Sequence, residues 1–164
     1  MLEKITESKT YVANELFATV DSLQRELKVD DLSEPIIISD TVGFIQNLPT
    51  TLIDSFKSTL TVVKEANLLI HVVDAASAIP EMHISTVHEI LKQIESNVEE
   101  LLVFNKIDKI DKASLNFLQE KYENAIFVSS IKQKNLDNLI SIITYKIFGN
   151  LIEVKLLTSP KHLD

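Results

Sequence analysis

The sequence predicts an α/β fold in which a mainly parallel sheet is flanked by helices. Short apolar runs alternate along the chain with segments whose apolar residues have helical spacing. Four of the runs lack alternation, which is typical of strands buried on both faces. A polar residue follows each of these runs, at Asp40, Asp74, Asn105 and Ser129. Ligands of parallel sheets bind beyond the carboxyl ends of the strands, so these positions are candidate site residues, although solubility alone also places polar residues there.

The expected elements follow one another in this alternating order. A weak strand or edge hairpin is expected within residues 22–34, and buried strands are expected at 36–38, 68–73, 101–104 and 126–128. Apolar residues at helical spacing predict helices at 51–65, about 81–95, 112–122 and 136–148. Gly149 fits a cap after the last helix, and the alternation that begins at Ile152 predicts a small extra strand. We therefore expect a domain over residues 1–148 and a C-terminal extension over 149–164.

Composition excludes several classes of function. The chain has 164 residues, of which 45% are hydrophobic and 24% charged, as in ordinary globular domains. Its net charge of −8 and its single arginine, Arg25, argue against a free-standing DNA-binding protein. No apolar run is long enough to span a membrane, and the N-terminus does not resemble a secretory signal. The absence of cysteine excludes disulfides and thiolate zinc sites, and it favours a cytoplasmic location.

The strongest motif is Asn105-Lys106-Ile107-Asp108, which directly follows a predicted buried strand. A carboxylate can accept two hydrogen bonds from guanine, one from N1–H and one from the exocyclic amine, and Asp108 supplies that group. The side chain of Asn105 can bridge neighbouring loops, and the aliphatic stem of Lys106 can lie over a base. The motif therefore indicates guanine recognition.

A second motif, Asp40-Thr41-Val42-Gly43, also follows a predicted strand. Its carboxylate could hold a water bound to Mg²⁺, and the amide of a residue without Cβ can approach a terminal phosphate closely. Taken alone, a strand followed by a turn explains this segment better.

Two weaker segments complete a series. A threonine hydroxyl in a loop can bind Mg²⁺, as in Phe17-Ala18-Thr19-Val20-Asp21. Backbone amides after the strand that ends at Val128 could bond the carbonyl oxygen of a guanine, as in Ser129-Ser130-Ile131. Neither segment is informative without the other motifs.

In this order the segments resemble the motif series of GTPases, and the likeness is closest to the HflX family of ribosome-associated GTPases. Three longer stretches are similar to that family: Tyr11 to Asp21, Asp40 to Ile45 with the following Leu48-Pro49, and Leu69 to Ala75. The resemblance runs from about residue 5 to about residue 145. It implies a P-loop GTPase-like fold, binding of GTP and GDP with Mg²⁺, and association with the large ribosomal subunit.

The resemblance also implies roles for individual residues. Thr19 and Asp40 match residues that bind Mg²⁺, and Gly43 matches a residue near the γ-phosphate. The base-recognition motif matches residues 105–108. The segment 129–131 matches the last base-contacting loop, although Ser130 and Ile131 replace the family's Ala and Lys. Further along this loop the family carries glycines, where this chain has Gln133 and Asn135, which places the geometry of the loop in question.

The largest departure from the family is the phosphate-binding loop G-x-x-x-x-G-K-[ST]. It is impossible within these 164 residues, whose only glycines are Gly43 and Gly149. We therefore expect the C-terminal part of a G domain, without its first, central strand, that binds and hydrolyses GTP poorly alone unless a separate chain carries the loop. Phe44 stands where many GTPases place a glutamine that orients water, and no residue qualifies as a general base.

Two other interpretations stay open. Because the base motif is present and the phosphate motif absent, the chain could be a non-catalytic module that docks on ribosomes or another partner; it could also be a remnant without a role. Among the histidines, His71 is expected to be a hydrogen-bonded core residue. His83 and His88 are five residues apart on a predicted helix, which does not match the i, i+4 pairing of zinc-binding helices, so no metal is assigned to them.

Overall fold

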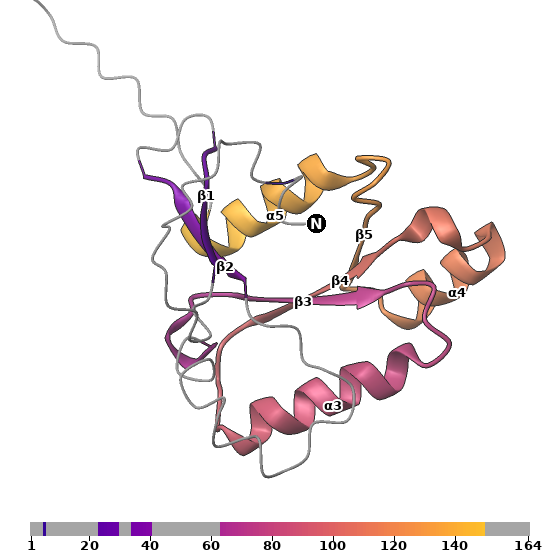
Figure 1. Cartoon of the computed structure of the whole chain (residues 1–164), viewed down its shortest axis with the longest axis horizontal. Coiled ribbons are helices and arrows are strands. Elements are labelled where there is room, and N and C mark those ends of the chain that lie inside the picture. The colour runs from indigo at the N-terminus through magenta and orange to yellow at the C-terminus, as the bar shows by residue number, and fades with distance from the viewer. Residues whose placement is uncertain (1–4, 6–22, 30–33, 41–62, 150–164) are drawn as a thin grey trace, which may run out of the picture.

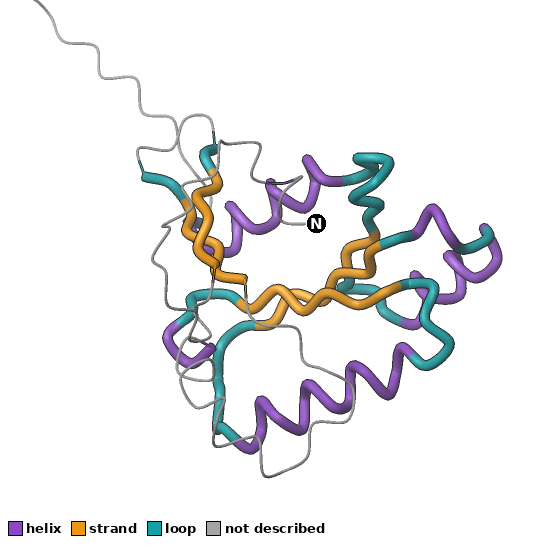
Figure 2. Tube along the Cα trace, in the orientation of Figure 1, coloured by secondary structure: helices purple, strands orange, loops and turns teal. Residues whose placement is uncertain are grey.

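The computed structural model describes residue 5 and residues 23–29, 34–40 and 63–149 (Figure 1). The predicted segments 17–21 and 41–43, most of the helix 51–65 and the C-terminal extension lie outside the described residues, apart from Gly149. Within the described ranges the strands form two separate groups, an antiparallel pair and a three-stranded parallel sheet (Figure 2). The predicted α/β class is confirmed.

The antiparallel pair consists of β1 (Leu23–Leu27) and β2 (Ile36–Asp40), with Leu27 opposite Ile36. Of the weak strand or edge hairpin expected within residues 22–34, the described residues form a strand, and it pairs with the first apolar run. Ile36 and Ile38 are buried, but Ile37 between them is 54% exposed. The prediction of a strand buried on both faces is wrong here, because an antiparallel pair can pack one face on the core and leave the other open.

The parallel sheet has the order β3-β4-β5, formed by β3 (Leu69–Asp74), β4 (Glu100–Asn105) and β5 (Ile126–Phe127). Its central strand β4 is buried on both faces, as the unbroken apolar run predicts. On β3 the prediction fails, because only Val73 is buried and Val72 is 44% exposed.

Helices cover the two faces of this sheet. Helix α3 (Pro80–Gln93) lies on one side of β3 and α5 (Leu136–Phe148) on the other, while α4 (Lys112–Lys121) lies beyond the carboxyl end of β4 (Figure 1). These bounds agree with the three predicted helices to within two residues at each end.

The ends of the helices have local causes in the sequence. Helix α3 begins at Pro80, whose fixed φ suits a first turn. Helix α4 is capped by the Asp111 side chain, which accepts a hydrogen bond of 2.7 Å from the Ser114 amide. Helix α5 ends at Phe148 and is capped by Gly149, which has a φ of 72° and whose amide donates to the Tyr145 carbonyl at 2.7 Å. The predicted glycine cap is confirmed.

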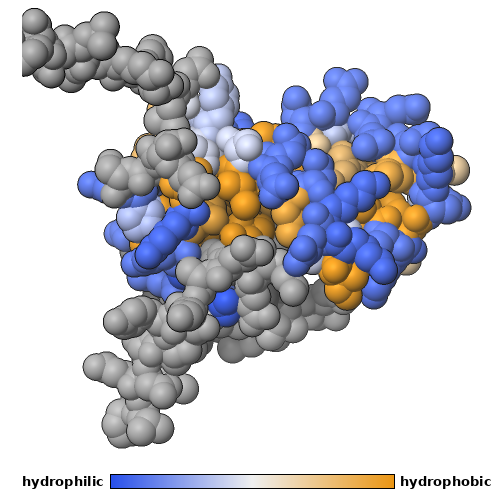
Figure 3. Space-filling model, turned by 90° about the horizontal axis from the view of Figure 1, so that it is seen from above, coloured by the Kyte–Doolittle hydropathy of each residue, from blue (hydrophilic) through white to orange (hydrophobic). Residues whose placement is uncertain are grey.

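The core has two parts on opposite faces of the sheet. One lies between the sheet, the β1–β2 pair and α5, and contains Leu101 and Val103 of β4. The other lies beneath α3 and α4 and contains Phe104, whose ring stacks on Phe127 with a centroid distance of 5.2 Å. Successive residues of β4 thus serve opposite layers. Seen from above, apolar residues gather in the middle of the face, with hydrophilic residues around them (Figure 3).

In the part of the chain that the structure describes, no helix has the length and apolar character needed to cross a membrane.

Candidate functional site

The candidate site lies where the carboxyl ends of the parallel strands meet. Asp74 and Asn105 are register partners at the ends of β3 and β4, and the Ala75 amide donates to the Asn105 carbonyl at 2.8 Å. The loop after β4 is tied to the following strand, because the Ile107 amide donates to the Val128 carbonyl at 3.2 Å. Three of the four residues predicted to follow strands therefore lie together at one edge of the sheet: Asp74, Asn105 and Ser129.

Asn105 joins two of these loops through one oxygen atom. Its Oδ1 accepts hydrogen bonds from the Lys106 amide at 2.8 Å, the Ser130 amide at 3.0 Å and the Ser130 hydroxyl at 2.9 Å. Two of these donors are backbone N–H groups, so the oxygen and nitrogen of the side-chain amide are assigned unambiguously. The predicted bridge between loops is confirmed, and among the described residues none accepts a hydrogen bond from the Asn105 Nδ2 group.

The carboxylate of Asp108 is exposed to solvent and is fixed in position by a hydrogen bond from a buried side chain. It lies in a single 3₁₀ turn, η2 (Ile107–Lys109), and its Oδ1 accepts a hydrogen bond from the hydroxyl of the fully buried Ser129. The same hydroxyl oxygen accepts the Lys132 amide at 3.1 Å. The Ser129 hydrogen bond lowers the pKa of the Asp108 carboxyl. The group is therefore ionised at neutral pH and points where a ligand can reach it.

The position of Lys106 depends on an unusual backbone conformation and on an ion pair made by its ammonium group. Its φ of 66° and ψ of 32° lie in the left-handed region, which is uncommon for a residue with a side chain. Its Nζ lies 2.6 Å from Oδ2 of Asp74, and both side chains are more than a third exposed, so this ion pair orients the lysine more than it stabilises the fold.

Asp74 belongs to the site, although no contact was predicted for it beyond its place at a strand end and within the stretch Leu69 to Ala75. Its Oδ1 accepts the Ala76 amide at 3.0 Å, and its Oδ2 accepts from Lys106. Burial is the largest single influence and raises the pKa of Asp74, but the Lys106 hydrogen bond, the Ala76 amide and nearby lysine charges together outweigh it, so the pKa is lowered. The feature of the sequence that indicated Asp74 as a site residue is its position directly after an apolar run.

The loop after β5 is closed by its own hydrogen bonds. The backbones of Ser129 and Lys134 bond in both directions, at 3.1 and 3.0 Å. Gln133 and Asn135 adopt left-handed φ values of 52° and 64°, so both take the conformation that glycine adopts most easily. The Asn135 side chain also donates to the Phe127 carbonyl at 2.9 Å. Ile131, at the tip, is 74% exposed.

The remaining predicted residues are placed differently. Asp40 lies at the carboxyl end of β2 and is exposed, as expected for a strand-end carboxylate. Residues 17–21 and 41–43 lie outside the described ranges, so the predicted Mg²⁺ and phosphate contacts of Thr19, Asp40 and Gly43 stay predictions.

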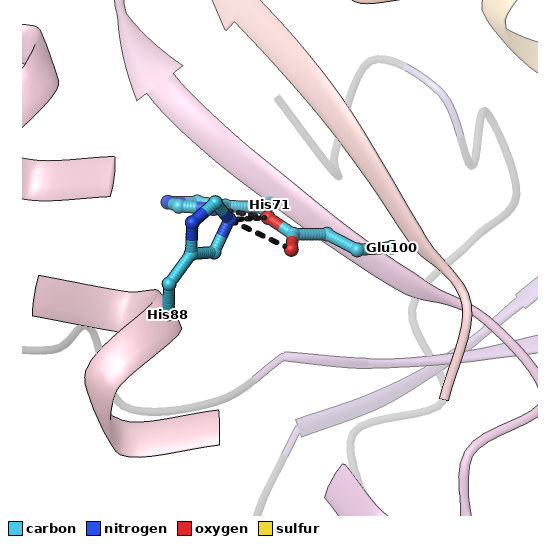
Figure 4. A group of neighbouring side chains, drawn as sticks. All are labelled: His71, His88 and Glu100. Carbon is cyan, nitrogen blue, oxygen red and sulfur yellow. Dashed lines mark hydrogen bonds and ion pairs between the residues drawn. The ribbon is translucent and has the colours of Figure 1, made fainter. Parts of the chain in front are cut away.

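Sequence motifs also did not predict a side-chain cluster near the other end of the sheet. His71 is the expected hydrogen-bonded residue, since its Nδ1 lies 2.6 Å from Oε1 of Glu100. His88 approaches the same carboxylate from α3 (Figure 4). These residues are far apart in the sequence, and only their spacing in the fold identifies them as a group.

Comparison with known proteins agrees with this arrangement. Residues 1–106 match the family described as 50S ribosome-binding GTPase. The GTPase HflX of Escherichia coli strain K12 is 33% identical over 98% of this chain, which spans 38% of that relative. The GTPase HflX of Alkalihalophilus pseudofirmus is 38% identical over 83% of this chain, which spans 31% of that relative.

Solved structures show the same fold. Aquifex aeolicus Era bound to GDP and AlF₄⁻ has a TM-score of 0.64 at 18% identity, and the alignment covers 98% of this chain and 55% of the other. Era in complex with MgGDPNP and a segment of 16S ribosomal RNA has the same TM-score at 19% identity, over 98% of this chain and 54% of the other. The parallel sheet, its flanking helices and the loops at its carboxyl edge thus define an α/β domain of the P-loop GTPase class.

The chain belongs to the 50S ribosome-binding GTPase family, among its HflX members. It spans less than half the length of the two HflX relatives described above.

Proposed function

We propose that this chain carries the guanine-recognition part of an HflX-type GTPase and binds GTP and GDP through the loops after β4 and β5. The observation that carries the proposal is the held carboxylate of Asp108, exposed to solvent and fixed by the buried hydroxyl of Ser129. An ionised carboxylate in a fixed orientation is the acceptor that the two adjacent N–H donors of guanine require.

Each neighbouring residue has a distinct part in this proposal. Asp108 accepts N1–H and the exocyclic amine, and the Lys106 stem lies along the base plane. Asn105 holds the two loops in register and keeps its Nδ2 group available for a ligand. The Ser130 amide already donates to Asn105 Oδ1, so in this proposal the next backbone amide, that of Ile131, faces the guanine carbonyl oxygen. A backbone contact of this kind does not depend on the replacement of the family's Ala and Lys side chains.

The phosphate side of the proposal rests on fewer described residues. The exposed carboxylate of Asp40 suits Mg²⁺, which prefers hard oxygen ligands and keeps several waters. Asp40 and Thr19 would hold the ion, which supplies positive charge to the phosphates, and Gly43 would lie near the γ-phosphate. The 164 residues contain no G-x-x-x-x-G-K-[ST] motif, and Phe44 cannot orient water. We therefore propose weak binding and slow hydrolysis by this chain alone.

The test compares guanine and adenine nucleotides. Titration calorimetry with GDP and ADP should show a preference for GDP that falls by about 10- to 100-fold in Asp108→Asn, because an amide offers only one acceptor to two donors. Xanthine carries a carbonyl where guanine carries the amine, so Asp108→Asn should bind XDP better than GDP. Asp111→Asn is the matched control, since asparagine caps a helix as well as aspartate does. Equal binding of GDP and ADP by the parent, binding of neither, or an unchanged preference in Asp108→Asn would refute the proposal.

A second candidate function is a non-catalytic module that docks on the large ribosomal subunit in the cytoplasm. It is favoured by the combination of fully formed base-recognition loops and the absence of the phosphate-loop motif from these residues. Co-sedimentation with ribosomes that does not change when GTP, GDP or no nucleotide is present would support this candidate. Co-sedimentation only with GTP would support the nucleotide switch instead.

A further inference from the structure

Three potential metal ligands meet between the sheet and helix α3. His71 projects from β3, Glu100 from β4 and His88 from α3, and all three point toward one another (Figure 4). The His71 Nδ1 lies 2.6 Å from Glu100 Oε1, and the His88 Nε2 lies 3.2 Å from Oε1 and 3.0 Å from Oε2. One donor atom of each residue lies within 4.8 Å of the other two.

The fold places these residues together for reasons visible in the sequence. On β3, His71 shares its face with Val73, and on β4 Glu100 shares its face with Phe104; Val73 and Phe104 both belong to the core beneath α3. On α3, His88 comes one turn after the buried Ile84 and so faces the sheet. Glu100 begins β4 and the candidate nucleotide site lies at the other end of that strand, about 16 Å away, while His71 precedes Asp74 of that site by three residues, or about 10 Å.

We propose that His71, His88 and Glu100 form a binding site for a divalent transition metal, with zinc the best-suited ion. Two imidazoles and one carboxylate are a ligand set that zinc favours, whereas Mg²⁺ and Ca²⁺ prefer oxygen ligands throughout. Three protein ligands leave a tetrahedral position for water. The proposal is independent of the nucleotide site.

The two pairs that each histidine forms with Glu100 fit such an ion after a small adjustment, and one nitrogen of each imidazole lies within 4.8 Å of the other. Ligand atoms about 2.0–2.1 Å from a tetrahedral zinc lie about 3.3 Å from one another. The His88 nitrogen is already 3.0 and 3.2 Å from the two carboxylate oxygens. The His71 nitrogen would have to move about 0.7 Å away from Oε1, as the metal takes the place of the shared proton.

Burial and charge also suit the ion. The His71 side chain is 9% exposed, Glu100 22% and His88 53%, so the cluster is enclosed by protein on one side and reachable through His88 on the other. The Glu100 carboxylate supplies negative charge to a cation bound there. A bound ion would link α3 to both strands.

The experiment measures zinc binding by the full chain without nucleotide. After treatment with a chelator and its removal, ZnCl₂ is titrated in a calorimeter. One ion per chain should bind, with affinity at least about 100-fold lower in His88→Ala and in Glu100→Gln, since even an outer-shell partner is worth about 10- to 100-fold. His88 is half exposed, so its removal should leave the fold intact, which circular dichroism checks.

His83→Ala is the matched control, because His83 lies on the same helix but outside the cluster, with its Nδ1 3.5 Å from the Ser77 hydroxyl. Binding in this variant should equal that of the parent. Zinc should also raise the melting temperature of the parent and of His83→Ala, but not that of His88→Ala. Absence of saturable binding by the parent, parent-like affinity in both cluster variants, or an equal loss in His83→Ala would overturn the proposal.

Discussion

Replacing Asn105 by alanine should destabilise the domain, because one side-chain oxygen serves three donors. The Oδ1 atom bonds the amide and the hydroxyl of Ser130 and the amide of Lys106. Ser130 is partly buried, so its two donors lose a partner that water replaces only in part, whereas the amide of the exposed Lys106 can turn to solvent. Counting about 1 kcal/mol for each Ser130 donor, we expect a loss of about 2 kcal/mol in the free energy of unfolding.

Urea denaturation followed by circular dichroism measures this loss. For a small domain, about 2 kcal/mol lowers the denaturation midpoint by about 1–2 M. Asn105→Asp is the matched variant, because it keeps an acceptor oxygen and loses only the amide donor. It should retain more than half of the lost stability. Any repulsion between its new charge and Asp74 should weaken as salt is added.

Two results would refute this reasoning. One is an Asn105→Ala variant whose stability stays within about 0.5 kcal/mol of the parent, which would mean that the three bonds contribute nothing net. The other is an Asn105→Asp variant that, at high salt, loses as much stability as the alanine variant. In that case the amide group, not the shared acceptor oxygen, would hold the loops.

Two further predictions concern the loop after β5 and the buried histidine. Gln133→Gly should stabilise the domain by about 0.5–1 kcal/mol, because glycine removes the cost of a left-handed φ of 52°. Lys132→Gly, at a residue without positive φ, should instead destabilise it; urea melts measure both, and a destabilising Gln133→Gly would contradict the expectation. The pKa of His71 lies below its ordinary 6.5 in the folded chain, so as pH falls below about 6.5 the unfolded chain takes up a proton first and stability is lost. With chelator present, urea midpoints should fall less with decreasing pH in His71→Gln than in the parent, and parallel curves would contradict this.

The sequence was sufficient to locate the elements that build the site. Strand β4 and the motif after it were both predicted, because a strand buried on two faces leaves an unbroken apolar run and the polar residues begin where it ends. The loop bridge made by Asn105 was also anticipated. The strand and the motif depend on neighbouring residues, which a single sequence displays directly. The bridge joins Asn105 to Ser130, 25 residues later, and its prediction rested on the hydrogen-bonding capacity of an asparagine at a strand end.

Features that depend on distant residues were missed. The run at Ile36–Ile38 has the composition of a strand buried on both faces, but the exposure of Ile37 is decided by which elements pack beside β2. Likewise, the pairing of Asp74 with Lys106 spans 32 residues, and that of His71 with Glu100 spans 29. The spacing of apolar residues along the sequence does not indicate such contacts.

Strand β4 makes the position of the recognition loops depend on the packing of the whole domain. Its Val103 contacts one core layer and its Phe104 the other, and the next residue is Asn105. A cavity opened on either side would let the strand shift along its axis, and the three donors gathered on the Asn105 oxygen would lose alignment together. Under the proposed function, substitutions in either core layer, well away from the loops, should therefore change the preference for guanine nucleotides.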